Sequence, residues 1–475
     1  MAQMVPALLR LTPLEQYFLD EERPGFPMVI VMAVHLDGDV DVESLRQALT
    51  TTLKQHPLLQ SIVVRQGRKS YWKQVEPVEL NLEIRRWDHP DEPPACPTRW
   101  IDLSKSTGTQ FRLEYSANRS VLICWFHHAC VDGIGVQDFL ADTFAAYAEL
   151  RPNPDLAELP VKRELDPEHL LRRGELRPPG EKGKRTPLHR KITNAGRLLL
   201  VRSLRLRGRC RSNQTPLDLP NVLHTRIFDR GTVRSLRRVA AAHDASLNDL
   251  IMFVYVQQLH ELTNWAKPKS TDKFRILVPI SLRTPRHDQM PSANVVSYVF
   301  HAYTREQISR PAELIRLIRE RTKRMLTNNE GGTMLQALKI MQAFPFGYQL
   351  SQVLQKDFAT AVLANVGDLK RMFGNRFPFR RGRAVAGDLT IHRINGIAPI
   401  RPNTNIVVSM GQYAGEVTFN LQFQPGEISK AEANTLLDGI SIHLNAIGRT
   451  EDLFAASKSI RHSEPPTVQT AFAQS

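Results

Sequence analysis

The chain has 475 residues, of which 42% are hydrophobic and 23% are charged, a composition typical of a folded globular protein with room for two domains. The formal net charge is +15, but residues 171–210 hold 13 Lys and Arg against 2 Asp and Glu, which leaves +4 for the other 435 residues. The basic character therefore belongs to one segment and is not the charge pattern of a nucleic-acid-binding fold.

The four cysteines, Cys96, Cys124, Cys130 and Cys210, lack the spacing of a disulfide framework and indicate a reducing compartment. No apolar run approaches the length of a membrane span, and the N-terminus shows no cleavage-site pattern. We expect a cytoplasmic protein.

The first elements alternate between helix and strand. Thr12 is suited to cap a short helix over residues 12–21, and residues 28–38 form an apolar strand that ends in an Asp-Gly turn. A second helix, with apolar residues at helical spacing from Val42 to Leu53, is stopped by Pro57. Further strands are expected at residues 59–65, 71–75, 80–87, 109–115 and 121–126. This order predicts an α/β (α+β) arrangement rather than a strict βαβ repeat.

Residues 127–133, with the sequence HHACVDG, lie between the strand at residues 121–126 and an amphipathic helix. Adjacent strand residues point to opposite faces, so only one of His127 and His128 can face a given cavity. A neutral imidazole can take a proton from a hydroxyl or amine and return it to a leaving group. Gly133 allows either a positive φ or a close approach by a substrate.

Each of these residues also has a purely structural interpretation. Asp132 is a good N-cap for the following helix, and Asp-Gly is a common turn pair. A lone buried histidine is usually a satisfied core residue. A metal site is disfavoured because the two histidines diverge and no C-x-x-C or H-x-x-x-H spacing accompanies them. Cys130 as a nucleophile with His128 as its base is conceivable, although nothing else marks an activated thiol.

From residue 151 to about 217 the hydrophobic periodicity gives way to Pro, Gly and basic residues, which indicates a linker. Leu188, Ile192, Ala195 and Leu199 fall at helical spacing, so part of the linker is a candidate helix with a basic opposite face. A solvated connector is favoured over a surface for anionic lipid or an acidic carrier protein. Nucleic acid is the weakest alternative, because aromatic residues that stack on bases are absent there.

The second half begins with a strand at residues 222–228 and helices at 230–243 and 246–263, the latter capped by Ser246. A strand at 274–280 precedes a loop that contains Arg283 and Asn294. Two long helices are expected at residues 305–326 and 333–355, then strands at 360–363, 384–394, 403–413 and 416–423, and a helix at 429–447. Asn365 is a turn residue on the simple interpretation, and residues 370–383 form a second basic cluster. The tail from about residue 458 is expected to be disordered.

The HHACVDG string resembles the HHxxxDG signature of the acyl-thioester-dependent acyltransferase superfamily, which includes nonribosomal peptide synthetase condensation domains, alcohol acetyltransferases, polyketide-associated acyltransferases and wax-ester synthases. The LTPLEQ and QHPLLQS segments resemble the opening of that family. The SLR of residues 281–283 followed by Asn294 resembles its SLR…GN block, with Ala293 in place of the usual Gly. Residues 364–367, ANVG, resemble its SN-x-G strand end.

The resemblance implies two chloramphenicol-acetyltransferase-like sandwich domains with a tunnel between them. On this basis we expect domains at residues 1–155 and 218–457, a basic linker at 156–217 and a disordered tail at 458–475. His128 would be the general base near the middle of the tunnel, with His127, Asp132, Gly133 and Arg283 supporting the site and Arg283 pairing with Asp132. Asn294 and Asn365 would line the tunnel, and donor and acceptor would enter from opposite ends. The resemblance implies neither a metal nor another cofactor, since the acyl-CoA or acyl-carrier thioester is a substrate.

The DFGWG block of plant acyltransferases is missing, and no adenylation or carrier-serine motif is visible. We therefore expect a stand-alone enzyme that acylates a hydroxyl from an acyl-CoA or acyl carrier protein, without an acyl-enzyme. The alternatives are an amide-forming condensation enzyme with carrier-bound substrates and a catalytically silent binding protein. Expected partners are the thioester, an alcohol or amine acceptor and a carrier protein, with peripheral membrane contact through the linker, no nucleic acid and a monomeric state. Acyl chain length, the acceptor and the choice between CoA and carrier stay open.

Overall fold

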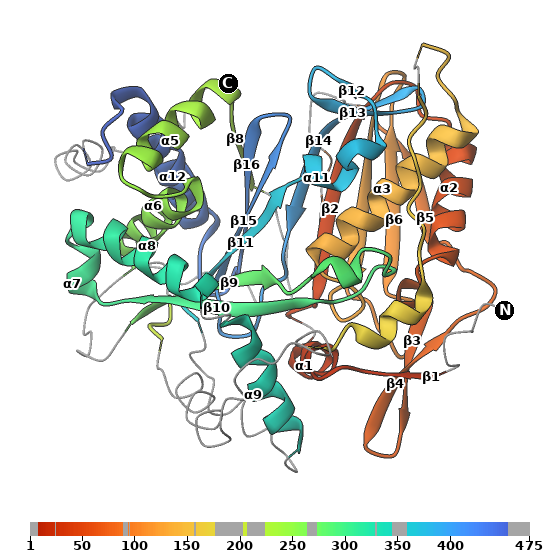
Figure 1. The fold of residues 1–475 in the computed structure, drawn as a ribbon, viewed down its shortest axis with the longest axis horizontal. Helices are drawn as coiled ribbons and strands as arrows, with labels where there is room; N and C mark the ends of the chain where they lie inside the picture. Colours follow the sequence, from red (N-terminus) through yellow and green to blue (C-terminus); the bar gives the residue numbers. More distant parts are fainter. Residues whose placement is uncertain are drawn as a thin grey trace, which may run out of the picture.

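The computed structural model describes residues 8–454 except 24, 89–93, 95, 156–157, 176–202, 207–223, 264–272, 328–329 and 344–358. Within these residues the strands form three sheets, two of them large, which lie side by side in the middle of the molecule (Figure 1). Helices α5, α6, α8 and α12 gather on one flank, and α2 and α3 on the opposite flank. This mixed α/β architecture of two sheet-rich halves confirms the predicted fold class.

The seven-stranded sheet has the order β12-β13-β14-β2-β7-β6-β5, the six-stranded sheet β10-β9-β11-β15-β16-β8, and the small sheet β1-β4-β3. The strands are β1 (Leu8–Arg10), β2 (Val29–Asp37), β3 (Ser61–Gln66), β4 (Lys69–Gln74), β5 (Leu82–Arg86), β6 (Thr109–Tyr115), β7 (Arg119–His127), β8 (His224–Phe228), β9 (Phe274–Ser281), β10 (Val296–Tyr303), β11 (Ala361–Asp368), β12 (Phe379–Arg380), β13 (Arg383–Ala386), β14 (Leu389–Ile397), β15 (Ile406–Tyr413) and β16 (Glu416–Phe423).

Helices α2 and α3 pack on each other beside the seven-stranded sheet, and α5, α6 and α12 pack together against the six-stranded sheet. The helices are α1 (Pro13–Glu21), α2 (Val42–Lys54), α3 (Gly133–Leu150), α5 (Arg230–Ala242), α6 (Leu247–Leu262), α7 (Arg305–Ile308), α8 (Pro311–Thr327), α9 (Gly331–Ala343), α11 (Lys370–Phe373) and α12 (Lys430–Thr450). Short 3₁₀ turns occur at Pro57–Gln60, Pro167–Arg172, Pro285–His287 and Gly374–Arg376.

The two halves of the chain are interleaved at the seven-stranded sheet. Strand β14 pairs antiparallel with β2, and Ile397 lies opposite Val31. Residues 379–397 therefore complete the sheet of the N-terminal half, although the expected second domain at residues 218–457 contained them. The boundary at residue 218 therefore does not separate the two sheets. The sequence could not indicate this, because no local signal states which sheet edge a strand will join.

Helix starts follow the capping residues that the sequence indicated. Thr12 accepts a hydrogen bond from the backbone N–H of Glu15, whose carboxylate accepts in return from the N–H of Thr12. Ser246 and Asp249 form the same reciprocal box at α6. Each box satisfies backbone donors that the first turn of a helix cannot pair internally.

Several predicted elements were wrong in extent or pairing. The helix expected over residues 305–326 is broken into α7 and α8, and α8 begins at Pro311, which lacks the N–H that a continuous helix would need. The strand expected over 384–394 is a hairpin of β13 and β14 with Gly387 at φ +62° in its turn. The strands expected at residues 59–65, 71–75 and 80–87 do not share one sheet: β3 and β4 belong to the small sheet, and β5 pairs parallel with β6 in the seven-stranded sheet. Strand β10 was not predicted.

Most of the basic linker, with its candidate helix at Leu188 to Leu199, and the tail from residue 458 lie outside the described residues, as does the end of the helix expected over 333–355. No helix in the described part of the chain combines the length and the apolar character that a membrane crossing requires.

Candidate active site

The HHACVDG turn is held at the end of a buried central strand. Strand β7 lies between β2 and β6, and its last residue, His127, is opposite Val29. The backbone N–H of His127 donates to the carbonyl of Gly108 at 2.8 Å, and that of His128 donates to the carbonyl of Met28 at 2.6 Å. Backbone pairing on both sides therefore fixes the point at which the two imidazoles diverge.

His127 is fully buried and turned toward α1. Its Nδ1 accepts the backbone N–H of Ala129 at 3.1 Å, so the ring proton is on Nε2, which lies 3.1 Å from Glu22 Oε2. The other carboxylate oxygen of Glu22 accepts the N–H of Met28 at 3.2 Å. His127 thus braces the strand end against the segment after α1.

His128 has the opposite tautomer. Its Nδ1 lies 2.9 Å from the carbonyl oxygen of Val131, which can only accept, so Nδ1 carries the proton and Nε2 carries a lone pair. The ring of Phe18 stacks on the imidazole with centroids 4.4 Å apart and planes 18° apart. Burial lowers the pKa of His128 below its usual value and outweighs the carbonyl of Val131 and the charge of Asp132, which raise it. The neutral ring is the form that can accept a proton.

Asp132 is buried and fully engaged. Its Oδ1 accepts the N–H of Gly135 at 2.9 Å as the N-cap of α3. Its Oδ2 accepts from Arg283 Nη1 at 2.6 Å and from the N–H of Val295 at 2.7 Å. Burial by itself raises the pKa of this carboxyl, but Arg283 and the two backbone donors more than offset it, so the pKa is lowered. The N-cap and the pair with Arg283 thus coexist, and the carboxylate is committed to structure.

The segment before β10 closes over the motif from the other half of the molecule. The amide of Asn294 donates to the carbonyl of His128 at 2.5 Å, and Ser292 Oγ donates to the carbonyl of Gly135 at 2.6 Å. Arg283 Nη2 donates to the carbonyl of Ala293 at 3.0 Å. The carbonyl of Ala293 is therefore turned toward Arg283. Asn294 is buried, and its Oδ1 has no hydrogen-bond partner among the described residues.

A cavity of about 370 Å³ reaches the His128 ring between the two large sheets. Its walls come from β2 and β14 on one side and from β9, β10 and β11 on the other, with the start of α3 and α11 at its edge. The amide of Gln137 on α3 spans the gap and donates to the carbonyl of Val366 on β11 at 3.1 Å. The apolar lining consists of Ile30, Met32, Ile134, Pro279, Ile280, Val296, Ala364, Val366, Met372, Ile397 and Ala398.

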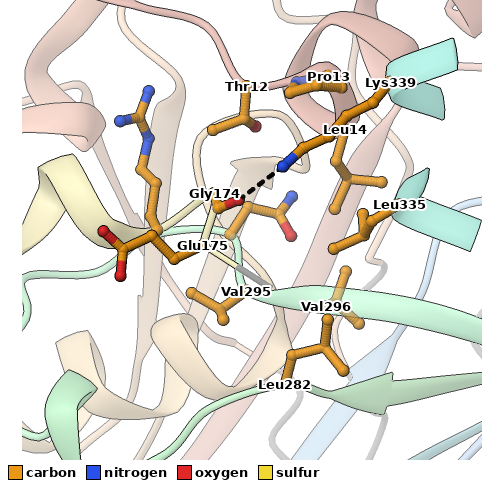
Figure 2. Close-up of a pocket in the computed structure, with 12 residues that line it drawn as sticks. Thr12, Pro13, Leu14, Gly174, Glu175, Leu282, Val295, Val296, Leu335 and Lys339 are labelled. Carbon is orange, nitrogen blue, oxygen red and sulfur yellow. Dashed lines mark hydrogen bonds between the residues drawn. The ribbon is translucent and has the colours of Figure 1, made fainter. Parts of the chain in front are cut away.

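A second hollow, of about 20 Å³, adjoins the cavity at the start of β10, where Val296 lines both. Figure 2 shows this hollow between α1, α9 and the turn at Gly174, with Lys339 reaching across to the carbonyl of Gly174 at 3.5 Å. Asn294, which bonds the backbone of His128, also lines it. The hollow has room for about one water molecule.

Two further predicted residues line the large cavity. Asn365 donates to Asn248 Oδ1 at 2.9 Å, and its own Oδ1 accepts the N–H of Gly367 at 2.8 Å, so it is also the turn residue of the simple interpretation. Gly133 has no positive φ, and an added Cβ would meet only Val366 Cγ1 at 4.0 Å. Of the two alternatives for Gly133, a positive φ and a close approach by a substrate, the second remains.

The remaining alternative, Cys130 as a nucleophile, is disfavoured. The thiol is fully buried, and burial raises its pKa well above the usual value, with Glu15 and Glu22 adding to the effect. A thiolate is the nucleophilic form, and it is the form that such burial suppresses.

Some site residues were not found from the sequence. Phe18 lies in the helix that was predicted, but no pattern indicates that its ring meets His128. Glu22 follows that helix as an ordinary polar residue. Both are brought to the motif by the fold, 110 and 105 positions along the chain from their histidine partners. The LTPLEQ resemblance was the signal that could have directed attention to this helix.

The N-terminal part of the sequence is similar to known proteins. The Condensation domain family model matches residues 19–164. The chain is 28% identical over 164 residues to a probable non-canonical nonribosomal peptide synthetase, CymA, from Salinispora arenicola (strain CNS-205), a stretch that makes up 33% of this chain and 2% of that protein. The chain therefore spans only a small fraction of the length of this relative.

Solved structures match over nearly the whole chain. Polyketide synthase associated protein 5 from Mycobacterium tuberculosis superimposes with a TM-score of 0.62 at 14% identity, covering 94% of this chain and 99% of that one. The starter condensation domain of rhizomide synthetase RzmA, an R148A mutant in complex with C8-CoA, gives 0.61 at 10% identity, covering 93% and 95%. Residues 19–164 thus have condensation-domain sequence, and the chain has the fold of condensation domains and their acyltransferase relatives, which the HHxxxDG resemblance predicted.

Proposed function

We propose that the chain transfers an acyl group from a thioester to an acceptor hydroxyl, with His128 as the general base. One observation carries the proposal: His128 lines a cavity between the two sheets, and its Nδ1 is held by a carbonyl, which leaves Nε2 as the unprotonated nitrogen. A fixed tautomer beside a cavity suits a base that acts by orientation.

In the proposed reaction, Nε2 of His128 takes the proton of the acceptor O–H as the oxygen attacks the thioester carbonyl carbon. The C–S bond then breaks, and the departing sulfur receives that proton from the imidazolium. The products are an ester and a free thiol, and no acyl-enzyme forms. Asp132, Arg283 and Asn294 hold the turn that carries His128, and the thioester is the only activated group that the proposal requires.

The lining of the cavity favours an aliphatic or aromatic acyl group. Most of its wall consists of Ile, Val, Met, Ala and Pro side chains, and apolar groups leave water for such surfaces at about 25 cal/mol per Å². The RzmA condensation domain was crystallised in complex with C8-CoA. An octanoyl thioester is therefore the first donor that we would test.

Amide formation is the second candidate, and a specific observation favours it. The Condensation domain match and the similarity to a probable nonribosomal peptide synthetase both concern the N-terminal part of the chain that holds His128. An amine acceptor would use the same base and the same proton balance. Product mass distinguishes an ester from an amide directly.

The test compares wild type with His128→Gln in the release of free thiol from octanoyl-CoA, with panels of alcohols and amines as acceptors. His443→Gln is the matched control, because His443 is also buried but lies in α12 and does not line the cavity. We expect His128→Gln to lower the rate of transfer at least a hundredfold and His443→Gln to keep it. Full turnover by a folded His128→Gln protein would rule out the base.

The alternative of a catalytically silent protein predicts a different result in the same experiment. If wild type binds the octanoyl thioester but releases no thiol with any acceptor or carrier-bound donor, the chain is a binding protein with this fold. Product mass and a thermal melt of each variant separate that outcome from misfolding.

A further inference from the structure

Seven exposed cations form one basic surface that extends from the cavity. They belong to α5 and, more than 130 residues later in the chain, to α11 and the β12–β13 hairpin. We call this surface the basic face; its members are Arg230, Arg234, Arg237, Lys370, Arg371, Arg380 and Arg381. The sequence indicated the cluster at residues 370–383, but not the arginines of α5 that join it.

Hydrogen bonds connect the three elements. Arg230 Nη2 donates to the carbonyl of Arg381 at 2.8 Å, which joins the start of α5 to the β12–β13 turn. Arg237 Nη2 donates to Gln412 Oε1 at 2.5 Å, and the carbonyl of Gln412 accepts the N–H of Leu369, immediately before α11, at 2.8 Å. The basic face is therefore continuous, and it begins at Arg371, which lines the cavity.

The positive charge of the basic face is not neutralised within the described residues. None of its seven side chains has a carboxylate within 4.0 Å there. Arg230 and Arg237 bond carbonyl and amide oxygens, which leave their charge intact. The carboxylates nearby are engaged, since Asp229 caps α5 and Glu416 pairs with Arg383. Seven unpaired cations on one face create a potential that attracts an anionic partner.

The shape of the basic face indicates how large that partner is. Arg230, Arg234 and Arg237 fall at i, i+4 and i+7, which places them along one side of α5 over about 10 Å. At the cavity itself Arg371 is accompanied by Asp368, so most of the unpaired charge lies farther out, over α5 and the β12–β13 turn. A surface that spreads outward in this way matches a protein with acidic side chains along a helix, rather than a small anion at the opening.

We infer that the basic face docks an acidic acyl carrier protein, whose phosphopantetheine arm delivers the thioester into the cavity past Arg371. This inference rests on the proposed function and specifies that the thioester donor is attached to a carrier protein. The carrier's acidic helix would lie against α5, and the single phosphate at the root of the arm would meet Lys370 and Arg371. Charge complementarity of this kind raises the rate of association and fixes orientation.

The test is the double variant Arg234→Glu/Arg237→Glu, with Lys323→Glu/Arg324→Glu on α8 as the control. Both pairs are exposed on helices, and both reverse two positive charges. Three octanoyl thioesters are compared: octanoyl acyl carrier protein, octanoyl-CoA and the short N-acetylcysteamine thioester. We expect the α5 variant to lower kcat/KM at least tenfold for the carrier thioester only, and the control to change none of the three.

Two outcomes of this experiment overturn the inference. An unchanged kcat/KM with the carrier removes the basic face as its docking surface. An equal loss with octanoyl-CoA assigns the surface to nucleotide phosphates instead. If wild type turns over no donor, the proposed function fails, and fluorescence anisotropy of a labelled carrier still tests docking: binding must be present, weaken with salt and weaken in the α5 variant.

Discussion

Phe18 lies flat against the imidazole of His128, with ring centroids 4.4 Å apart and both rings buried. Helix α1, which carries Phe18, is tied to the second half of the chain through Arg401, whose guanidinium pairs with Glu21 and bonds Tyr17 Oη. Helix α1 therefore covers one face of the imidazole of His128, the proposed base, and His128 also lines the cavity. This cover contributes to the burial that lowers the pKa of His128.

Phe18→Ala should move the pH dependence of transfer. Because the neutral imidazole is the active form, the rate falls on the acid side as His128 takes up a proton. Removing the ring of Phe18 admits water, raises the pKa of His128 toward its usual value of about 6.5 and shifts the acid limb of kcat to higher pH. Phe18→Leu keeps an apolar cover and should shift it less. The pH profile of kcat, with the His128 ring followed by NMR, checks this.

Both Phe18 variants should lose stability. Truncating a buried Phe to Ala costs about 3–5 kcal/mol, and Phe18→Leu should cost less. Stability alone would scale the rate at every pH and leave the position of the acid limb in place. An acid limb that stays at the wild-type pH in Phe18→Ala would mean that Phe18 is only a packing residue.

Buried histidines should make the fold sensitive to mild acid. Burial lowers the pKa of His35, His301 and His443 to about 4 in each case. The unfolded chain takes up these protons near pH 6.5, so stability is fully present above that pH and is lost as pH falls from 6.5 toward 4. For one such group the loss approaches about 3 kcal/mol by pH 4.

His443→Leu should reduce this sensitivity. Neither ring nitrogen of His443 has a hydrogen-bond partner among the described residues, and the side chain is 1% exposed in α12 beside Phe253. Replacing it with an apolar residue removes an unsatisfied polar group, which is worth about 1 kcal/mol at pH 7. Urea unfolding at pH 7 and pH 5 measures both effects. Equal losses on acidification in wild type and variant would contradict the assignment.

The sequence predicted those parts of the fold that local patterns determine. Thr12 and Ser246 cap helices because their hydroxyls satisfy free backbone donors, and such caps depend on residues within one turn. The buried strand before His127 and the helix after Asp132 were likewise predicted from short apolar patterns. The resemblance added the pairing of Arg283 with Asp132, which lies across 151 residues of chain.

What local patterns could not indicate is which distant segments meet. The antiparallel pairing of β14 with β2 depends on sheet edges that exist only in the folded molecule. The ring of Phe18 on His128 and the carboxylate of Glu22 on His127 depend on the same long-range packing. Strand β10 is a different kind of miss, because its apolar run begins soon after Pro291 and Asn294, which favour turns, so a local signal was present.

The pair of Asp132 and Arg283 should behave as a coupled unit. Asp132 is 2% exposed, so Arg283→Met leaves a carboxylate without its main counter-charge, which we expect to cost about 3 kcal/mol. Asp132→Asn keeps an oxygen for the N–H of Gly135 and should cost less. The double variant should lose less than the sum of the single losses. A double-mutant cycle from urea unfolding measures the coupling, and strict additivity would show that the pair contributes nothing.

Two glycines two residues apart in the same turn should respond to alanine in opposite ways. A Cβ on Gly135 would lie 2.5 Å from Val131 Cγ2 and 2.9 Å from the carbonyl oxygen of Ala293, at the contact between the halves. Neither backbone nor core side chain can give way there, so Gly135→Ala should cost about 1–3 kcal/mol. Thermal and urea unfolding measure this loss.

A Cβ on Gly133 meets only Val366 at 4.0 Å, and the backbone there has an ordinary φ. Gly133→Ala should therefore fold with unchanged or slightly raised stability, by up to about 1 kcal/mol, while its methyl group projects into the cavity beside His128. We expect the variant to melt like wild type but to change KM across a series of acyl chain lengths. If Gly133→Ala instead unfolds readily and Gly135→Ala does not, the turn must be shaped differently from the geometry that places His128 at the cavity.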